Sequence, residues 1–166
     1  MAASEPASAQ IGTPLWSPEN LAHVGYVVPK MERALSQWER SGAKLIIPPE
    51  LDPIQNVVCS LLLVAGSFPI ELVAPMPEGP NPVANRLSKG GGIDHVCIYV
   101  DDIVESVETF KEAGGICVVD PVYGAVFDRL IAFVMTRPGL VIELMERRPE
   151  GRRPVDPLRA LNVWSS

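Results

Sequence analysis

The first half of the chain carries an alternating apolar pattern, then a helical stripe, then further strand-like runs. Residues 21–28 distribute apolar side chains over two faces of an extended segment, which predicts a strand. A helix is predicted over residues 31–41, with Gly42 as its stop, because one of its faces is apolar: Met31, Ala34, Leu35 and Trp38. Three more strands are expected, near residue 45 and over residues 57–64 and 70–73.

The second half repeats this order. A strand is predicted over residues 93–100, and Asp101 and Asp102 can cap the helix that follows. The apolar stripe of this helix consists of Ile103, Ser106, Val107 and Phe110. The remaining strands are expected near residues 116–119 and over residues 130–136 and 141–145.

These patterns predict one domain over residues 19–146, built from modules at about 19–75 and 92–146 with a linker at 76–91. Residues 1–18 are rich in Ala, Ser and Pro and are predicted to form a disordered leader. Residues 147–166 carry several arginines and prolines and are interpreted as a C-terminal tail.

A histidine and a glutamate recur in the two halves at one spacing, 72 residues. His23 in LAHVGYVV corresponds to His95 in IDHVCIYV, and Glu71 in PIELVAP corresponds to Glu143 in VIELMER. The helix stripes and the glycines that follow them recur at the same spacing. A duplicated imidazole and carboxylate can supply four metal ligands once the two halves face each other.

Strand alternation places the glutamates on one side of the predicted sheets. An Ile and a Leu flank each glutamate and suit the face under a helix, so Glu71 and Glu143 point to the opposite, concave face. Two curved βαβββ modules would then form an open, metal-centred barrel, an α+β fold whose cavity collects two His and two Glu. Enclosed charges are costly unless they are paired or bind a cation. The mixed set suits one divalent ion, Co, Ni, Zn, Mn, Fe or Mg, and a metal-free cavity for an organic ligand is the alternative.

Composition narrows the classes of function. A net charge of −6 over 166 residues argues against sequence-independent nucleic-acid binding, which relies on clustered Lys and Arg. No apolar run reaches the roughly 18 residues that a membrane span needs, so we expect no membrane association. The N-terminus lacks the basic start and apolar stretch of a secretory signal. Three cysteines without zinc-site spacing fit reduced core thiols, and we expect a cytoplasmic protein.

The arrangement resembles the vicinal oxygen chelate superfamily, which includes glyoxalase I, extradiol dioxygenases, bleomycin-resistance proteins and methylmalonyl-CoA epimerase. The run IELVAPMPEGPNPVANRL, followed by GGGIDHVCIYVDDI, is similar to the epimerase branch, and GLVIEL resembles its closing strand. The resemblance implies that His23, Glu71, His95 and Glu143 bind one divalent metal and leave two coordination positions for substrate oxygens or water. It also implies a small carbonyl or acyl-CoA substrate and a homodimer.

The resemblance also raises the question of which residue transfers the proton. Epimerases of this branch carry a glutamate on the third strand of the first half as a base, and our alignment places Cys59 there. The base candidates are therefore Glu143 and Glu71, with Cys59 as a further acid/base candidate and Asp128 in reserve. An inert thiol is the alternative reading of Cys59, because burial in apolar surroundings raises the pKa of a thiol.

We therefore expect a metal-dependent isomerase or epimerase that works through the enolate of an acyl thioester or similar carbonyl substrate. The first alternative is a lyase or cyclase on the same scaffold, which the missing third-strand glutamate favours. An Fe(II) dioxygenase is the next, although such enzymes use two His and one carboxylate, so Glu71 speaks against it. A non-catalytic ligand-binding or resistance protein is the last.

Overall fold

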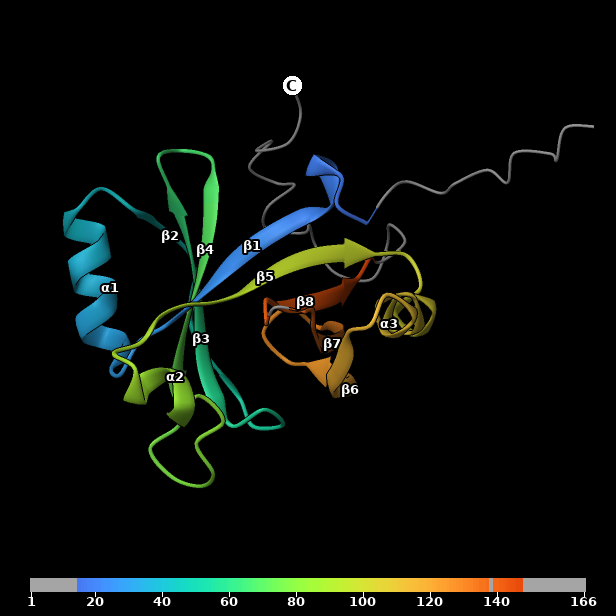
Figure 1. Cartoon of the computed structure of the whole chain (residues 1–166). Helices are drawn as coiled ribbons and strands as arrows, with labels where there is room; N and C mark the ends of the chain where they lie inside the picture. Colours follow the sequence, from blue (N-terminus) through green and yellow to red (C-terminus); the bar gives the residue numbers. More distant parts are fainter. Residues whose placement is uncertain (1–14, 138, 148–166) are drawn as a thin grey trace, which may run out of the picture.

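The computed structural model describes residues 15–137 and 139–147, in which two modules share one sheet (Figure 1). After a 3-10 turn, η1 (Pro18–Asn20), the first module contains β1 (Leu21–Val27), α1 (Met31–Arg40), β2 (Lys44–Asp52), β3 (Val57–Val64) and β4 (Phe68–Pro75). The short helix α2 (Ala84–Ser88) lies in the connection. The second module contains β5 (Gly92–Val100), α3 (Ile103–Glu112), β6 (Ile116–Gly124), β7 (Arg129–Met135) and β8 (Val141–Glu146).

The eight strands form one curled, mixed sheet in the order β2-β3-β4-β1-β5-β8-β7-β6. The modules join through β1 and β5, which pair antiparallel at the centre of the sheet. Within each module the first strand pairs parallel with the last, β1 with β4 and β5 with β8. The predicted α+β fold of two βαβββ modules is confirmed, and the central β1–β5 pair is the contact that makes a single open barrel of them.

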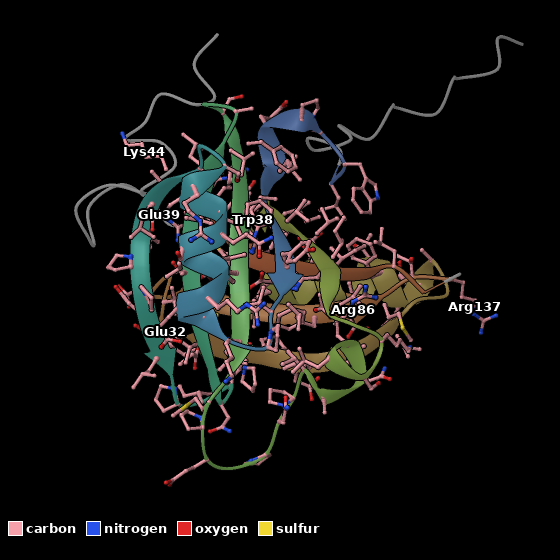
Figure 2. The ribbon with its side chains drawn as sticks, turned by 90° about the vertical axis from the view of Figure 1, so that its left-hand side faces the viewer. Glu32, Trp38, Glu39, Lys44, Arg86 and Arg137 are labelled. Carbon is pink, nitrogen blue, oxygen red and sulfur yellow. The ribbon has the colours of Figure 1, made fainter. Side chains whose placement is uncertain are left out.

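Each helix covers the outer face of its own module, as the Ile and Leu residues beside the glutamates predicted. Ile70 and Leu72 pack with the buried face of α1, and Ile142 and Leu144 pack with that of α3. Figure 2 shows α1 lying over the strands of the first module, and the Trp38 ring on this helix meets the ring of Tyr26 edge to face at 5.4 Å. Because these apolar neighbours point outward to the helices, each intervening glutamate points inward.

Two strands are longer than the sequence pattern predicts. β2 continues to Asp52 through Pro48 and Pro49, and β6 continues to Gly124 through Pro121. Both are edge strands of the sheet, where a residue without an N–H is tolerated. Their ladders are also irregular near the prolines. The predicted strands near residue 45 and over residues 116–119 thus cover only the first part of β2 and β6.

The folded domain begins earlier than predicted, because residues 15–18 of the predicted disordered leader are part of the described structure. Residues 1–14 of the predicted leader and residues 148–166 of the predicted tail lie outside the described part of the chain. Leu15 packs against the apolar cluster under α3, and Trp16 meets the ring of Phe110 edge to face at 6.3 Å.

Asp102 caps α3 as predicted, because its side chain accepts a hydrogen bond from the backbone N–H of Glu105 at 2.9 Å. None of the helices in the described residues is long and apolar enough to cross a membrane.

Candidate metal centre

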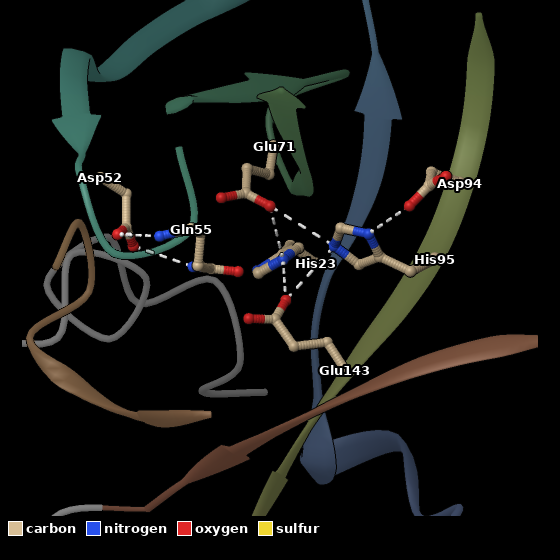
Figure 3. Close-up of polar contacts among 7 residues, drawn as sticks. All are labelled: His23, Asp52, Gln55, Glu71, Asp94, His95 and Glu143. Atoms are coloured by element: carbon tan, nitrogen blue, oxygen red, sulfur yellow. Dashed lines mark hydrogen bonds and ion pairs between the residues drawn. The ribbon is translucent and has the colours of Figure 1, made fainter. Parts of the chain in front are cut away.

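The structure brings together all four residues that the sequence predicted as ligands (Figure 3). His23 and His95 come from the central strands β1 and β5, and Glu71 and Glu143 come from the strands that pair parallel with them. One ligand atom from each residue lies within 4.8 Å of all the others. We call this group the His/Glu cluster. Its members are only 1–5% exposed, although each carries a polar or charged side chain.

Each carboxylate of the His/Glu cluster lies between the two imidazoles. The Nε2 atom of His23 is 3.0 Å from Glu143 Oε2 and 3.3 Å from Glu71 Oε2. The Nε2 atom of His95 is 3.3 Å from Glu143 Oε2 and 3.4 Å from Glu71 Oε2. The two modules therefore contribute equally, one imidazole nitrogen and one carboxylate oxygen each.

Burial and mutual attraction act against each other in this cluster. Burial alone would lower the pKa of His23, but the charge of Glu71 and the hydrogen bond with Glu143 raise it to about 9. Burial likewise opposes the charged form of His95, yet its hydrogen bonds with Asp94, Glu143 and Glu71 raise its pKa well above the usual value. Burial would raise the pKa of both glutamates, but the neighbouring imidazoles hold both below the usual range. Without a cation, the cluster is thus an ion-paired group that retains protons on its imidazoles.

The donor set fits a divalent cation. Two nitrogens and two carboxylate oxygens from four buried side chains converge on one point, which is the composition expected for a borderline or hard divalent metal. The Nε2 atom of His95 has no partner of good hydrogen-bond geometry in the described residues, although it lies close to both carboxylates. A cation between the four atoms would give that nitrogen a partner and would offset the repulsion between two enclosed carboxylates.

Two residues that sequence reasoning missed place His95. The Nδ1 atom of His95 lies 3.1 Å from Asp94 Oδ2, which leaves Nε2 for the cluster (Figure 3). Gly25 lies opposite His95 in the β1–β5 ladder, and a Cβ atom there would overlap the imidazole ring. The sequence does give a hint of the role of Gly25. The 72-residue spacing relates Gly25 to Cys97, so the two halves differ at this position. The sequence gives no such hint for Asp94, because strict strand alternation would place it on the face opposite to that of the adjacent His95.

The His/Glu cluster faces a cavity of about 740 Å³. Around the cluster the lining is mostly apolar and includes Val57, Val73, Val126, Phe127, Ile131 and Phe133. The polar lining includes Asp52, Gln55 and Asp94, together with Arg86 and Lys89 of the α2 segment. This is the size and character of a small-molecule site, apolar walls with a few convergent polar groups.

The two remaining acid/base candidates have different positions. Cys59 lines the cavity, where burial and then the negative charge of Glu71 raise the pKa of its thiol well above the usual value. Asp128 is not among the residues that line the cavity, and it accepts a hydrogen bond from the Tyr123 hydroxyl at the turn between β6 and β7. The structure therefore brings Cys59 to the site as a protonated thiol and leaves Asp128 outside it.

Comparison with known proteins agrees with this fold. A profile of the glyoxalase/bleomycin resistance protein/dioxygenase superfamily matches residues 22–133. An ethylmalonyl-CoA/methylmalonyl-CoA epimerase of Cereibacter sphaeroides is 34% identical over 96 residues, which are 57% of this chain and 70% of that protein. The mitochondrial methylmalonyl-CoA epimerase of Bos taurus is 33% identical over 102 residues, 60% of this chain and 57% of that protein.

Solved structures show the same fold. A hypothetical protein from Bacillus halodurans C-125 superposes with a TM-score of 0.68 at 29% identity, covering 80% of this chain and 97% of that one. Methylmalonyl-CoA epimerase from Mycobacterium tuberculosis superposes with a TM-score of 0.67 at 27% identity, covering 79% and 89%. The chain therefore belongs to the glyoxalase/bleomycin resistance protein/dioxygenase superfamily, the vicinal oxygen chelate group, and within it to the branch of the methylmalonyl-CoA epimerases. The matched segment spans little more than half the length of the bovine relative.

Proposed function

We propose that this protein is a metal-dependent epimerase or closely related isomerase that removes and returns a proton at the α-carbon of an acyl thioester. The observation that carries the proposal is the His/Glu cluster, four ligand atoms within 4.8 Å at one cavity, two from each module. The named relatives support the choice of substrate class, because those with a named activity are epimerases of methylmalonyl-CoA or ethylmalonyl-CoA.

His23, Glu71, His95 and Glu143 would hold one divalent ion. When bound, such an ion polarises a substrate carbonyl and stabilises the negative charge that develops as the α-proton leaves. The protein's part is to present the four ligand atoms in a buried group and to exclude water with the apolar wall of the cavity. Asp94 would bind the Nδ1 atom of His95, the ring nitrogen that faces away from the cluster, and its carboxylate would keep the proton on that nitrogen.

The two glutamates are the base candidates that this geometry supports. Their Oε2 atoms face the imidazoles, and Figure 3 shows the other oxygen of each turned toward the side of Gln55. Glu71 and Glu143 come from opposite modules, and either could accept a proton through that second oxygen while its Oε2 stays among the four ligand atoms. Cys59 is less suited to accept a proton, because its raised pKa keeps it a thiol at neutral pH.

The named relatives favour an isomerase over the lyase, cyclase, dioxygenase and non-catalytic alternatives. Two carboxylates in the cluster also depart from the single carboxylate that non-haem iron oxygenases use. Homodimer formation and a cytoplasmic location stay predictions.

Proton exchange with solvent tests the proposal directly. The metal-loaded protein is incubated in D2O with methylmalonyl-CoA and, separately, ethylmalonyl-CoA, and deuterium at the α-carbon is followed by mass spectrometry against an enzyme-free blank. Starting from one epimer, we expect both incorporation of deuterium and appearance of the other epimer. Incorporation without inversion would indicate that a single base faces the substrate. No incorporation above the blank, with the metal shown to be bound, would overturn the proposal.

A matched pair of variants assigns the activity to the cluster. Glu143→Gln keeps the size of the side chain but removes its charge, and Glu32→Gln makes the same change on the exposed surface of α1. We expect exchange to fall to the blank in the first variant and to stay at the parent rate in the second.

A further inference from the structure

Asp52 is a buried carboxylate beside the cavity that no cation pairs with among the described residues. It is 1% exposed and ends the edge strand β2. Its Oδ1 accepts hydrogen bonds from the backbone N–H groups of Ile54 and Gln55, each at 3.0 Å. Its Oδ2 accepts from the Gln55 side-chain amide at 2.8 Å and from the backbone N–H of Ala125 at 3.0 Å. Four N–H groups thus satisfy the charge and fix the carboxylate in place.

The chemistry of this contact decides which way the Gln55 amide points. An ionised carboxylate only accepts hydrogen bonds, so the NH2 end of the amide has to face Asp52. The amide oxygen is then turned away from Asp52, and Figure 3 shows it on the side of the His/Glu cluster. Within the described part of the chain, no hydrogen bond to this oxygen is found. Gln55 lines the same cavity as Glu71, His95 and Glu143.

The contact with Ala125 adds rigidity to this arrangement. Ala125 lies 73 residues further along the chain, in the turn between β6 and β7. Asp52 therefore ties the turn after β2 in the first module to a turn of the second module. The two turns stand at the ends of the two edge strands, so the same carboxylate closes this side of the cavity and orients Gln55.

We propose that Gln55 is a substrate-positioning residue, whose amide oxygen accepts a hydrogen bond from an N–H or O–H group beside the oxygen pair of the bound ligand, and that Asp52 holds it in that orientation. The proposal rests on the proposed function only in placing the ligand's oxygens at the His/Glu cluster. A neutral amide does not take up a proton at neutral pH, so the role of Gln55 is distinct from that of the two glutamates.

A ligand that meets this acceptor directly is an oxygen chelator with a hydrogen-bond donor next to its chelating atoms. An acyl thioester has no donor there and would meet the Gln55 oxygen through a water molecule. A fixed acceptor discriminates against an analogue that lacks the donor, because the acceptor then loses its hydrogen bond with water without gaining another. Acetohydroxamate and N-methylacetohydroxamate form a suitable pair of probes. Both chelate through two oxygens, and they differ in one N–H.

The test compares the dissociation constants of the two hydroxamates for the metal-loaded protein, measured by calorimetry. We expect the parent protein to bind acetohydroxamate about fivefold to tenfold more tightly than its N-methyl analogue, the worth of about one hydrogen bond. Gln55→Met keeps the length of the side chain without the acceptor and should bring the ratio close to one. If the methyl group merely clashed with the wall, the ratio would persist in Gln55→Met, and the proposal would be wrong.

Asp52→Asn tests the positioning role. An asparagine can present either its oxygen or its NH2 group to Gln55, so the Gln55 amide is free to turn over. The ratio should then fall to between the parent value and one, with metal content unchanged. A parent protein that binds both hydroxamates equally, or neither, overturns the inference about Gln55 while its metal content leaves the proposed function standing. A protein that retains no metal defeats both, and the metal titration shows this before any hydroxamate is added.

Discussion

The two histidines of the cluster occupy matching positions in the two modules, yet the protein supports them differently. His95 has a carboxylate, Asp94, on its outer nitrogen at 3.1 Å. The outer nitrogen of His23 has no hydrogen-bond partner in the described residues, and its ring stacks on Phe127 at 5.2 Å instead. The ligands have been kept in register across the duplication, and their surroundings have not. Equal spacing in the sequence therefore predicts the atoms that meet at the centre but not what holds them there.

The central strand pair shows the same inequality. In the β1–β5 ladder, His95 lies opposite Gly25 and His23 lies opposite Cys97, two positions 72 residues apart. The His95 ring occupies the space that a side chain at position 25 would need, whereas position 97, opposite His23, carries the buried thiol of Cys97. His95 is thus held both by a hydrogen bond and by the space left over Gly25. We therefore expect changes around His95 to lower metal affinity more than changes around His23.

Filling the space over Gly25 should have the largest effect on metal affinity. Gly25→Ala places a methyl group on the His95 ring, so the ring has to leave the cluster and one of four ligands is lost. We expect metal affinity to fall by at least about 1,000-fold, more than the roughly 100-fold that an outer-sphere change costs. Cys97→Ala is the matched change in the other module and should leave affinity within about threefold. Equal losses in the two variants, measured by competition with a chromophoric chelator, would contradict the comparison.

The pH dependence of the metal-free protein reports on His23. Its pKa rises from the ordinary 6.5 to about 9 in the folded chain, so the protonated ring stabilises the fold. This contribution is complete below pH 6.5 and is lost as the pH rises through about 9, a change of about 3 kcal/mol in the free energy of unfolding. We expect urea midpoints measured in chelator to fall over that interval.

Bound metal should reverse that trend, because it takes neutral imidazoles. The metal affinity therefore rises over the same pH interval, and the loaded protein should lose no stability there. A His23→Phe variant, measured without metal, should lack the part of the slope that belongs to His23. A slope unchanged in that variant would place the titration elsewhere.

How much of this site the sequence could predict depends on the range of the interactions. The four ligands and their inward face follow from local alternation and from one repeated spacing, which need no knowledge of the tertiary structure. The contact of Asp52 with Ala125 and the space over Gly25 are made between modules, and no local pattern encodes them. The apolar pattern did not predict that β2 and β6 continue through their prolines, because it does not identify them as edge strands, where proline is accepted.

Removing the carboxylate behind His95 should have the next largest effect. Asp94→Ala leaves the ring free to rotate and to carry its proton on either nitrogen, so we expect metal affinity to fall about 10- to 100-fold. Asp94→Asn can still accept a hydrogen bond from Nδ1 and should recover part of this loss. Glu32→Ala removes an equal charge far from the cavity and should change nothing, which separates local orientation from net charge. Equal affinities in Asp94→Ala and the parent would show that Gly25 alone fixes the ring.

The smallest loss of metal affinity is expected from changing Phe127, the residue that stacks on His23. Phe127 holds this ring only by stacking, with the two rings inclined by 18°, and provides no hydrogen bond that selects a tautomer. Phe127→Leu keeps an apolar contact with the ring while removing the flat face. We therefore expect metal affinity to fall less than tenfold, below the loss in Asp94→Ala, because a hydrogen bond from a carboxylate orients a ring more strongly than a stacked neighbour does. Chelator competition on both variants under one set of conditions gives the order. If Phe127→Leu cost more metal affinity than Asp94→Ala, packing would be the stronger support, and the first module would hold its histidine the more firmly.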